Sequence, residues 1–389
     1  MTTQGTTTTT GATPGAAAPP RGPVGLLVGL VGLGAVAFVI GLRTDAAPRA
    51  WATFLVNLLF WSGLAAAGPA IAGIFELTEA QWAVRLRRIA TTTVAFMPAS
   101  AVLFLVLCGA LGVLYPWVTE PVPKKALWLN VPFLVARVVI GVGALYWVSI
   151  RFAQAVHASP AGAAAEPGRA TRARLAVVML FLFVIVVSLF GFDLVMSLDP
   201  QWFSGLLGGY FVVGTVYSGF AFLVVLVAFR SRGRATWVMP PTEVQDLAKL
   251  VFATSILWMY FFWSQYLVIW YGNVPIETRY VVARFFKDPW RTVAITAFII
   301  GWLVPFGYLL GRLTGRPPER HGVLVGIACM SLIAIFLERT VLVYPSVLKG
   351  SGAAYGIVDL LVTVGFGALF VLSYVVFVPR LGLVSRLED

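Results

Sequence analysis

Residues 174–196 read RLAVVMLFLFVIVVSLFGFDLVM, and this stretch decides the fold class of the chain. It is almost wholly apolar and exceeds the length of about 20 residues that an α-helix needs to cross a bilayer. Nine further runs of this kind can be placed in the sequence. They cover residues 23–42, 51–75, 89–115, 128–150, 203–229, 247–271, 290–313, 319–342 and 356–378. We therefore expect an all-α membrane protein with about ten transmembrane helices.

The composition of the whole chain leads to the same class. Of the 389 residues, 59% are hydrophobic and 11% are charged, whereas an ordinary soluble domain contains about 25% charged residues. The net charge is +12, but the basic residues are spread between the apolar runs. Such a distribution is typical of the positive-inside rule and not of a basic nucleic-acid-binding patch. The expected surroundings are a lipid bilayer, with no nucleic-acid partner.

Composition also divides the chain into three regions. Residues 1–22 are rich in Thr, Gly, Ala and Pro, which predicts a disordered tail. Residues 23–379 form the polytopic domain, and residues 380–389 form a short C-terminal tail. Between the spans, Lys and Arg are more frequent on the side that holds both termini. We therefore predict that both termini lie in the cytoplasm.

Few residues in this chain can ligate a metal or a haem. Cys108 and Cys329 fall within apolar runs, where cysteine is usually a small buried side chain, and an iron–sulfur cluster needs more ligands. His157 and His321 fall in segments predicted as loops, so no pair of histidines is expected at membrane depth. We expect this chain to bind no metal or redox cofactor itself.

Ionisable residues at membrane depth are the first functional candidates, because each costs about 2.5–3.5 kcal/mol to insert. Arg137 lies within a span, Asp193 and Glu338 lie near the ends of theirs, and Asp359 lies near the start of the last one. All four fall toward the predicted outer side. They could form a proton path or hold a polar head group. Alternatively, Arg137 pairs with a carboxylate to fix helix packing, and the acids at the helix ends are hydrated.

The run 247–271 is the most aromatic of the ten. Its aromatic residues are Phe252, Trp258, Tyr260, Phe261, Phe262, Trp263, Tyr266, Trp270 and Tyr271. Together with Gln265, they could wall a quinone site, since a quinone ring stacks on aromatic rings and its oxygens accept hydrogen bonds. The aromatic residues surround the whole helix, however. This favours the alternative that the helix is a central packing element.

Three prolines, Pro69, Pro98 and Pro305, fall inside predicted spans. Proline lacks the backbone N–H and so frees the carbonyl four residues before it, which must find another donor in the membrane. We expect neighbouring groups in a helix bundle to supply these donors.

Three stretches of the sequence, read together, resemble a known family. They are KALWLNVPFLVAR at residues 125–137, FDLVMSLDPQWF at 192–203 and FWSQYLVIWYGNVPIET at 262–278. These motifs are similar to those of the second NrfD-like membrane subunit of bacterial alternative complex III, a quinol:cytochrome c oxidoreductase. The same superfamily includes the membrane subunit of polysulfide reductase.

The resemblance implies a fold and a set of partners. Spans 2–5 and 6–9 would form two four-helix bundles, with the first and last spans at the side. The partners would be multihaem and monohaem cytochrome c subunits, an iron–sulfur subunit and a sister NrfD-like subunit in a bacterial inner membrane. Haem c and iron–sulfur clusters would belong to those partners, whereas quinol or quinone could bind here.

The expected function is that of a cofactor-free membrane subunit in a respiratory quinol:electron-carrier oxidoreductase. It would contribute a quinone-facing or proton-conducting module to electron transport, in which Arg137, Asp193 and Asp359 shape a hydrated path near the outer face. Two alternatives stay open, a purely structural membrane anchor of the complex and a stand-alone secondary transporter.

Overall fold

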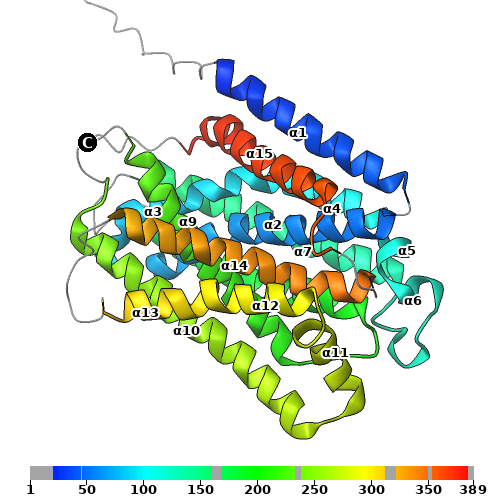
Figure 1. The fold of residues 1–389 in the computed structure, drawn as a ribbon. Coiled ribbons are helices and arrows are strands. Elements are labelled where there is room, and N and C mark those ends of the chain that lie inside the picture. Colours follow the sequence, from blue (N-terminus) through cyan, green and yellow to red (C-terminus); the bar gives the residue numbers. More distant parts are fainter. Residues whose placement is uncertain are drawn as a thin grey trace, which may run out of the picture.

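The computed structural model describes residues 21–44, 46–159, 168–232, 238–311, 321–348 and 353–383. Within these residues the regular elements are all helices (Figure 1). Ten helical segments of the described chain are long and apolar enough to cross a membrane, which confirms the predicted all-α membrane fold. Residues 1–20 of the predicted N-terminal tail and residues 384–389 of the C-terminal tail lie outside the described residues.

The ten spans follow the predicted order. They are α1 (Arg21–Leu42); α2 (Ala47–Leu77); η1 (Gln81–Ala83), α3 (Val84–Thr91), η2 (Thr92–Phe96) and α4 (Met97–Cys108) in one span; α7 (Val131–Ala158); α8 (Arg169–Leu189) with η4 (Phe190–Val195) and η5 (Met196–Leu198); α9 (Leu206–Arg230); α10 (Pro241–Gly272); α12 (Trp290–Phe298) with η6 (Ile299–Leu303) and α13 (Val304–Leu310); α14 (His321–Leu348); and α15 (Ile357–Arg380). Short helices between spans are α5 (Leu111–Leu114), α6 (Pro116–Thr119), η3 (Pro123–Lys125) and α11 (Pro275–Phe285).

Several helices extend beyond their predicted apolar windows. α7 ends at Ala158 and α10 begins at Pro241, because helical hydrogen bonding continues into the polar interface where hydropathy no longer marks it. The prediction that the histidines lie in loops is therefore wrong. His157 lies in the last turn of α7, and His321 is the first residue of α14.

The spans pack as two bundles with two helices beside them. α2, the span from η1 to α4, α7 and α8 form the first bundle, and α9, α10, α12–α13 and α14 form the second. α2 contacts both α9 and α14 and is buried along most of its length, so it is central to the molecule. α1 lies along α15 at the side (Figure 1). This arrangement confirms the predicted one.

The two ends of the molecule carry different elements. α1 begins and α15 ends at one of them. The other end, which we call the α11 end, carries residues 109–130, 199–205 and 273–289 (Figure 1). The distribution of basic residues predicts that the α11 end faces the outside.

A close contact between two glycines joins the lateral helices. A Cβ built on Gly34 of α1 would lie 2.7 Å from the Cα of Gly365 on α15. Any side chain at either position would therefore separate the helices, and small residues at such crossings are typical of helix packing in membranes.

The carbonyl freed by Pro305 is satisfied from another span. η6 is a π-helical segment that ends just before this proline. The Gly301 carbonyl accepts a hydrogen bond from the hydroxyl of Tyr217 on α9 at 2.6 Å. Tyr217 also bonds the Ser331 hydroxyl of α14 at 2.7 Å, so one tyrosine ties three spans of the second bundle together.

The other two prolines follow the same rule. Pro69 frees the carbonyl of Ala65, which accepts a hydrogen bond from the Thr93 hydroxyl at 3.0 Å. Pro98 frees the carbonyl of Val94, which is bonded by a backbone N–H within the adjoining tight helical turn. The expectation that neighbouring groups in the bundle supply the donors is confirmed for Pro69 and Pro305, whereas at Pro98 the donor is the backbone N–H of Met97 in the same span.

Candidate functional site

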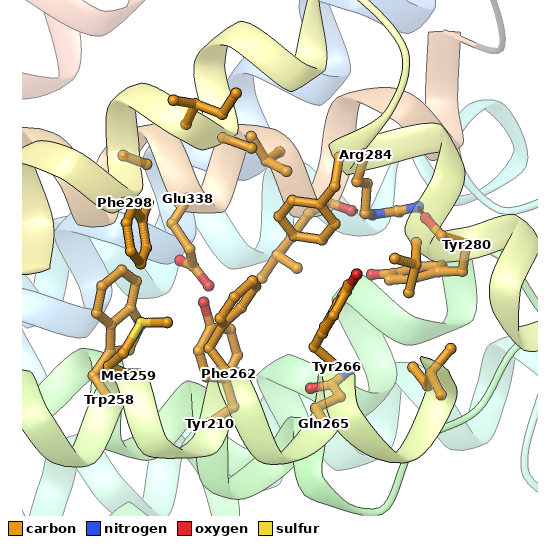
Figure 2. Close-up of a pocket in the computed structure, with 18 residues that line it drawn as sticks. Tyr210, Trp258, Met259, Phe262, Gln265, Tyr266, Tyr280, Arg284, Phe298 and Glu338 are labelled. Atoms are coloured by element: carbon orange, nitrogen blue, oxygen red, sulfur yellow. Dashed lines mark hydrogen bonds between the residues drawn. The ribbon is translucent and has the colours of Figure 1, made fainter. Parts of the chain in front are cut away.

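The second bundle contains a cavity of about 230 Å³ lined by α9, α10, α11, α12 and α14 (Figure 2). We call it the aromatic pocket. One face of α10 supplies much of its wall, through residues that recur at helical spacing. They are Trp258, Phe262, Gln265, Tyr266 and Ile269.

The other face of α10 is exposed on the surface of the bundle. It carries the exposed aromatic residues Tyr260, Trp263, Trp270 and Tyr271. The prediction that this helix is a central packing element is therefore wrong, since α2 occupies that position. The bilayer is itself apolar, so aromatic residues on all sides of a helix do not indicate burial on all sides.

Glu338 provides a carboxylate at one end of the aromatic pocket. Its side chain comes from α14, is buried, and points toward the hydroxyl of Tyr210 in Figure 2. Arg339 Nη1 donates a hydrogen bond to Glu338 Oε1 at 3.2 Å. It also forms an ion pair with Oε2 at 3.0 Å, and the Tyr210 hydroxyl bonds the same carboxylate. A carboxylate has about four lone-pair sites, and these partners do not occupy all of them. The carboxylate can thus accept a further donor.

Arg284 provides a buried cation near the other end of the pocket. It is 2% exposed, and Nη2 donates to the Leu342 carbonyl at 2.9 Å and to Ser346 Oγ at 2.6 Å. Nη1 donates to the Tyr280 carbonyl at 3.1 Å. No described carboxylate forms an ion pair with Arg284, so this charge is held by oxygen dipoles.

Tyr280 lies between Arg284 and Trp202. The guanidinium carbon of Arg284 is 3.3 Å from the ring centroid, and the Trp202 ring stacks on the tyrosine with 3.6 Å between centroids. The Tyr280 hydroxyl is buried, has no hydrogen-bond partner in the described residues, and points toward that of Tyr266 in Figure 2. Burial raises the pKa of Tyr280, so the hydroxyl remains a proton donor at neutral pH.

Two of the predicted site residues, Glu338 and Gln265, meet in the aromatic pocket. They come from spans that are far apart in the sequence, α14 and α10. Arg137, Asp193 and Asp359 lie elsewhere, in two separate clusters.

Arg137 and Asp193 form an ion pair in the first bundle. Asp193 lies in the π-helical segment η4, and its two oxygens accept hydrogen bonds from Arg137 Nε at 2.8 Å and Nη2 at 3.0 Å. Trp128 Nε1 donates to Asp193 as well, at 2.8 Å. The guanidinium is flanked by the rings of Trp128 and Phe133. Both carboxylate oxygens are occupied, which is the geometry of a structural ion pair.

Asp359 lies at the start of α15 and binds the start of α2. It accepts hydrogen bonds from Arg49 Nε at 2.8 Å, Thr53 Oγ1 at 2.5 Å and the backbone N–H of Gly356 at 2.7 Å. Within the described residues, no hydrogen bond or ion pair joins this cluster to Asp193. The proton role predicted for Arg137, Asp193 and Asp359 stays a prediction.

Tyr210, Tyr280 and Arg284 were not predicted as site residues from the sequence. Arg284 follows the end of a span, where an arginine usually indicates a hydrated loop. The available signal was the spacing of four between Tyr280 and Arg284, which puts both on one face of a helix. Nothing in the sequence indicated that this helix is covered by other elements.

The two cysteines are less buried than expected. Cys329 is exposed and Cys108 is half-buried, because a side chain of this kind is equally compatible with lipid and with a protein core. Among the described residues, no group of three or more His, Cys, Asp or Glu side chains could hold a metal ion.

Most of the chain matches a known protein family. A family model described as "Polysulphide reductase, NrfD" matches residues 41–349. All residues that line the aromatic pocket fall within this match. A search of curated proteins finds no match.

Proposed function

Since the chain belongs to the NrfD family, whose members are quinone-interacting membrane subunits of redox complexes, we propose that its aromatic pocket binds the head group of a quinone or quinol. More specifically, we propose that it is the second NrfD-like subunit of an alternative complex III in a bacterial inner membrane. Haem c and iron–sulfur clusters would reside in partner subunits, and this chain would carry quinone as its only redox-active ligand.

One observation supports the proposal most directly. The Tyr280 hydroxyl, which is buried without a hydrogen-bond partner in the described residues, and the Glu338 carboxylate, which pairs with Arg339, occur at separate places in the wall of one aromatic cavity. A buried polar atom left unpaired costs about 1–3 kcal/mol, so the Tyr280 hydroxyl is poised for a ligand with polar atoms, and the carboxylate keeps lone pairs for a further donor. Quinones and quinols carry two oxygens on opposite sides of a flat ring and match this arrangement.

Each polar side chain of the pocket then has a defined role in binding or oxidising the quinol head group. Glu338 Oε2 accepts a hydrogen bond and then a proton from a quinol hydroxyl, and the Tyr280 hydroxyl bonds the oxygen on the other side of the ring. Arg339 keeps the carboxylate in position through its hydrogen bond to Oε1. The aromatic walls exclude water and stack on the ring. Gln265 supplies an additional amide donor or acceptor to the pocket.

The proposal is tested with a photoreactive quinone analogue on the complex in native membranes. We expect cross-links to peptides of α10 and α14 that excess natural quinone prevents. The variant Glu338→Gln should assemble normally but oxidise quinol at least about tenfold more slowly, as expected for loss of a general base. The control is Asp246→Asn, another acid in a long span, which pairs with Lys249 and does not line the pocket.

Cross-links confined to other helices would refute the site. So would normal quinol oxidation by an assembled Glu338→Gln complex.

A further inference from the structure

A second cavity opens at the α11 end and is adjacent to the aromatic pocket. Its volume is about 410 Å³, and we call it the vestibule. Its wall contains several charged and polar side chains, among them Glu120, Asp199, Gln201, Arg279 and Ser346. Asp199 is held by Arg279, whose Nη2 lies 3.1 Å from each carboxylate oxygen. The vestibule is thus suited to water, in contrast to the aromatic pocket.

Two residues, Tyr280 and Arg284, line both cavities. Their side chains therefore form the wall that separates the vestibule from the aromatic pocket. The wall is held firmly, because Trp202 stacks on the outer ring face at 3.6 Å and Arg284 is fixed by three hydrogen bonds to oxygen atoms. Tyr280 and Arg284 are therefore the described side chains best placed to pass a proton from the pocket to the vestibule.

Tyr280 is the member of this wall that can transfer a proton. A phenol can accept a proton on its oxygen while it releases its own, whereas the guanidinium of Arg284 stays protonated. The positive charge of Arg284 lies over the tyrosine ring. It stabilises the negative charge that develops on the ring and its oxygen as the hydroxyl proton is released. Beyond the wall, Glu120 provides a carboxylate that can accept a released proton, whereas the charge of Asp199 is balanced by Arg279.

We propose that the vestibule is the aqueous proton exit of the aromatic pocket and that Tyr280 transfers the proton across the wall. This inference rests on the proposed quinol site. As the two quinol O–H bonds break, one proton goes to Glu338 and the other to the oxygen of Tyr280. Tyr280 releases its own proton to water in the vestibule. The two electrons pass one at a time to one-electron haem or iron–sulfur centres of partner subunits, so that two such reductions accompany the oxidation of one quinol.

The first test is Tyr280→Phe in the assembled complex. Phenylalanine keeps the stack on Trp202 and removes only the hydroxyl. We expect cross-linking of the photoreactive quinone within about twofold of the wild type, quinol oxidation slowed at least tenfold, and a larger solvent deuterium isotope effect. Wild-type oxidation rates with an unchanged isotope effect would overturn the inference.

The second test measures water access and needs no turnover. Cysteine is introduced at Ala283, which lines the vestibule, or at Ala297, which lines the aromatic pocket, after Cys108 and Cys329 are replaced by alanine. A membrane-impermeant thiol reagent applied to the α11 side should label Ala283→Cys rapidly and Ala297→Cys at least tenfold more slowly. Labelling of neither, or of both at one rate, would overturn the inference.

The outcomes separate the two proposals. Absence of quinone cross-links in the aromatic pocket refutes the proposed function, whatever the thiol labelling shows. Normal cross-links together with normal turnover of Tyr280→Phe refute only the proton exit.

Discussion

Arg137 donates two parallel hydrogen bonds to the carboxylate of Asp193, from Nε at 2.8 Å and from Nη2 at 3.0 Å. Trp128 Nε1 also donates to Asp193 Oδ1 at 2.8 Å, so both carboxylate oxygens are engaged. In the aromatic pocket, by contrast, the buried Tyr280 hydroxyl has no hydrogen-bond partner in the described chain, and the described partners of the Glu338 carboxylate are Arg339 and the Tyr210 hydroxyl. The carboxylate in the first bundle is thus bound on both oxygens, whereas the second bundle carries the pocket to which we assign the quinol.

Replacing Asp193 with Asn should destabilise the complex. Arg137 would remain mostly buried without its counter-ion, and breaking a buried pair in this way costs about 3–5 kcal/mol. We expect a lower melting temperature of the purified complex. The double variant Arg137→Leu/Asp193→Leu should recover part of the loss, because no isolated charge remains.

The same variants test the proton path predicted from the sequence. If the pair is only structural, turnover per assembled complex should match the wild type in both variants. Reduced proton release per assembled complex in both would instead support the path.

Replacing Tyr217 with Phe should destabilise the second bundle. The Gly301 carbonyl, which Pro305 frees, and the Ser331 hydroxyl would both lose this partner. The expected cost is about 1–3 kcal/mol, measured by thermal unfolding in detergent. Tyr260→Phe is the control, because Tyr260 is 62% exposed on the face of α10 away from the pocket. Equal melting temperatures for the two variants would contradict the assigned role of Tyr217.

Replacing Gly365 with Val should separate α1 from α15. A Cβ at this position would lie 2.8 Å from the Cα of Gly34, so the backbones must move apart. Overpacking of this kind costs about 1–3 kcal/mol, which lowers the melting temperature. Gly32→Val is the matched control, since a Cβ on Gly32 meets nothing within 4 Å. A similar decrease in both variants would show that the glycine contact is not the cause.

The two faces of α10 should respond differently to the same substitution. Trp258 is 4% exposed and lines the aromatic pocket, whereas Trp263 is 53% exposed on the other face. We expect Trp258→Phe to raise the KM for quinol several-fold, because part of the stacking surface is lost, and Trp263→Phe to leave it unchanged. Steady-state quinol oxidation at varied quinol concentration measures both. An effect on KM from Trp263→Phe alone would move the site to the lipid-facing side of α10.

The class, number and order of the spans could be predicted from the amino-acid sequence. Hydropathy is a local property, so runs of about 20 apolar residues mark helices wherever they pack. The sequence also predicted that the backbone carbonyls freed by Pro69, Pro98 and Pro305 would need other hydrogen-bond donors, because the loss of an N–H depends only on the residue type. Helix ends were less accurate, since α7 and α10 continue through polar residues that hydropathy does not mark.

Which polar residues lie together depends on the packing of the helices and could not be predicted from the sequence. Glu338 and Gln265 were candidates from the sequence, but their convergence with Tyr210, Tyr280 and Arg284 required the packing of four helices, α9, α10, α11 and α14. Asp359, a candidate of the same kind, instead pairs with Arg49 more than 300 positions away in the sequence. The pocket-facing and lipid-facing sides of α10 look alike in composition because both surroundings are apolar. Their difference arises from the neighbours that cover one face and not the other.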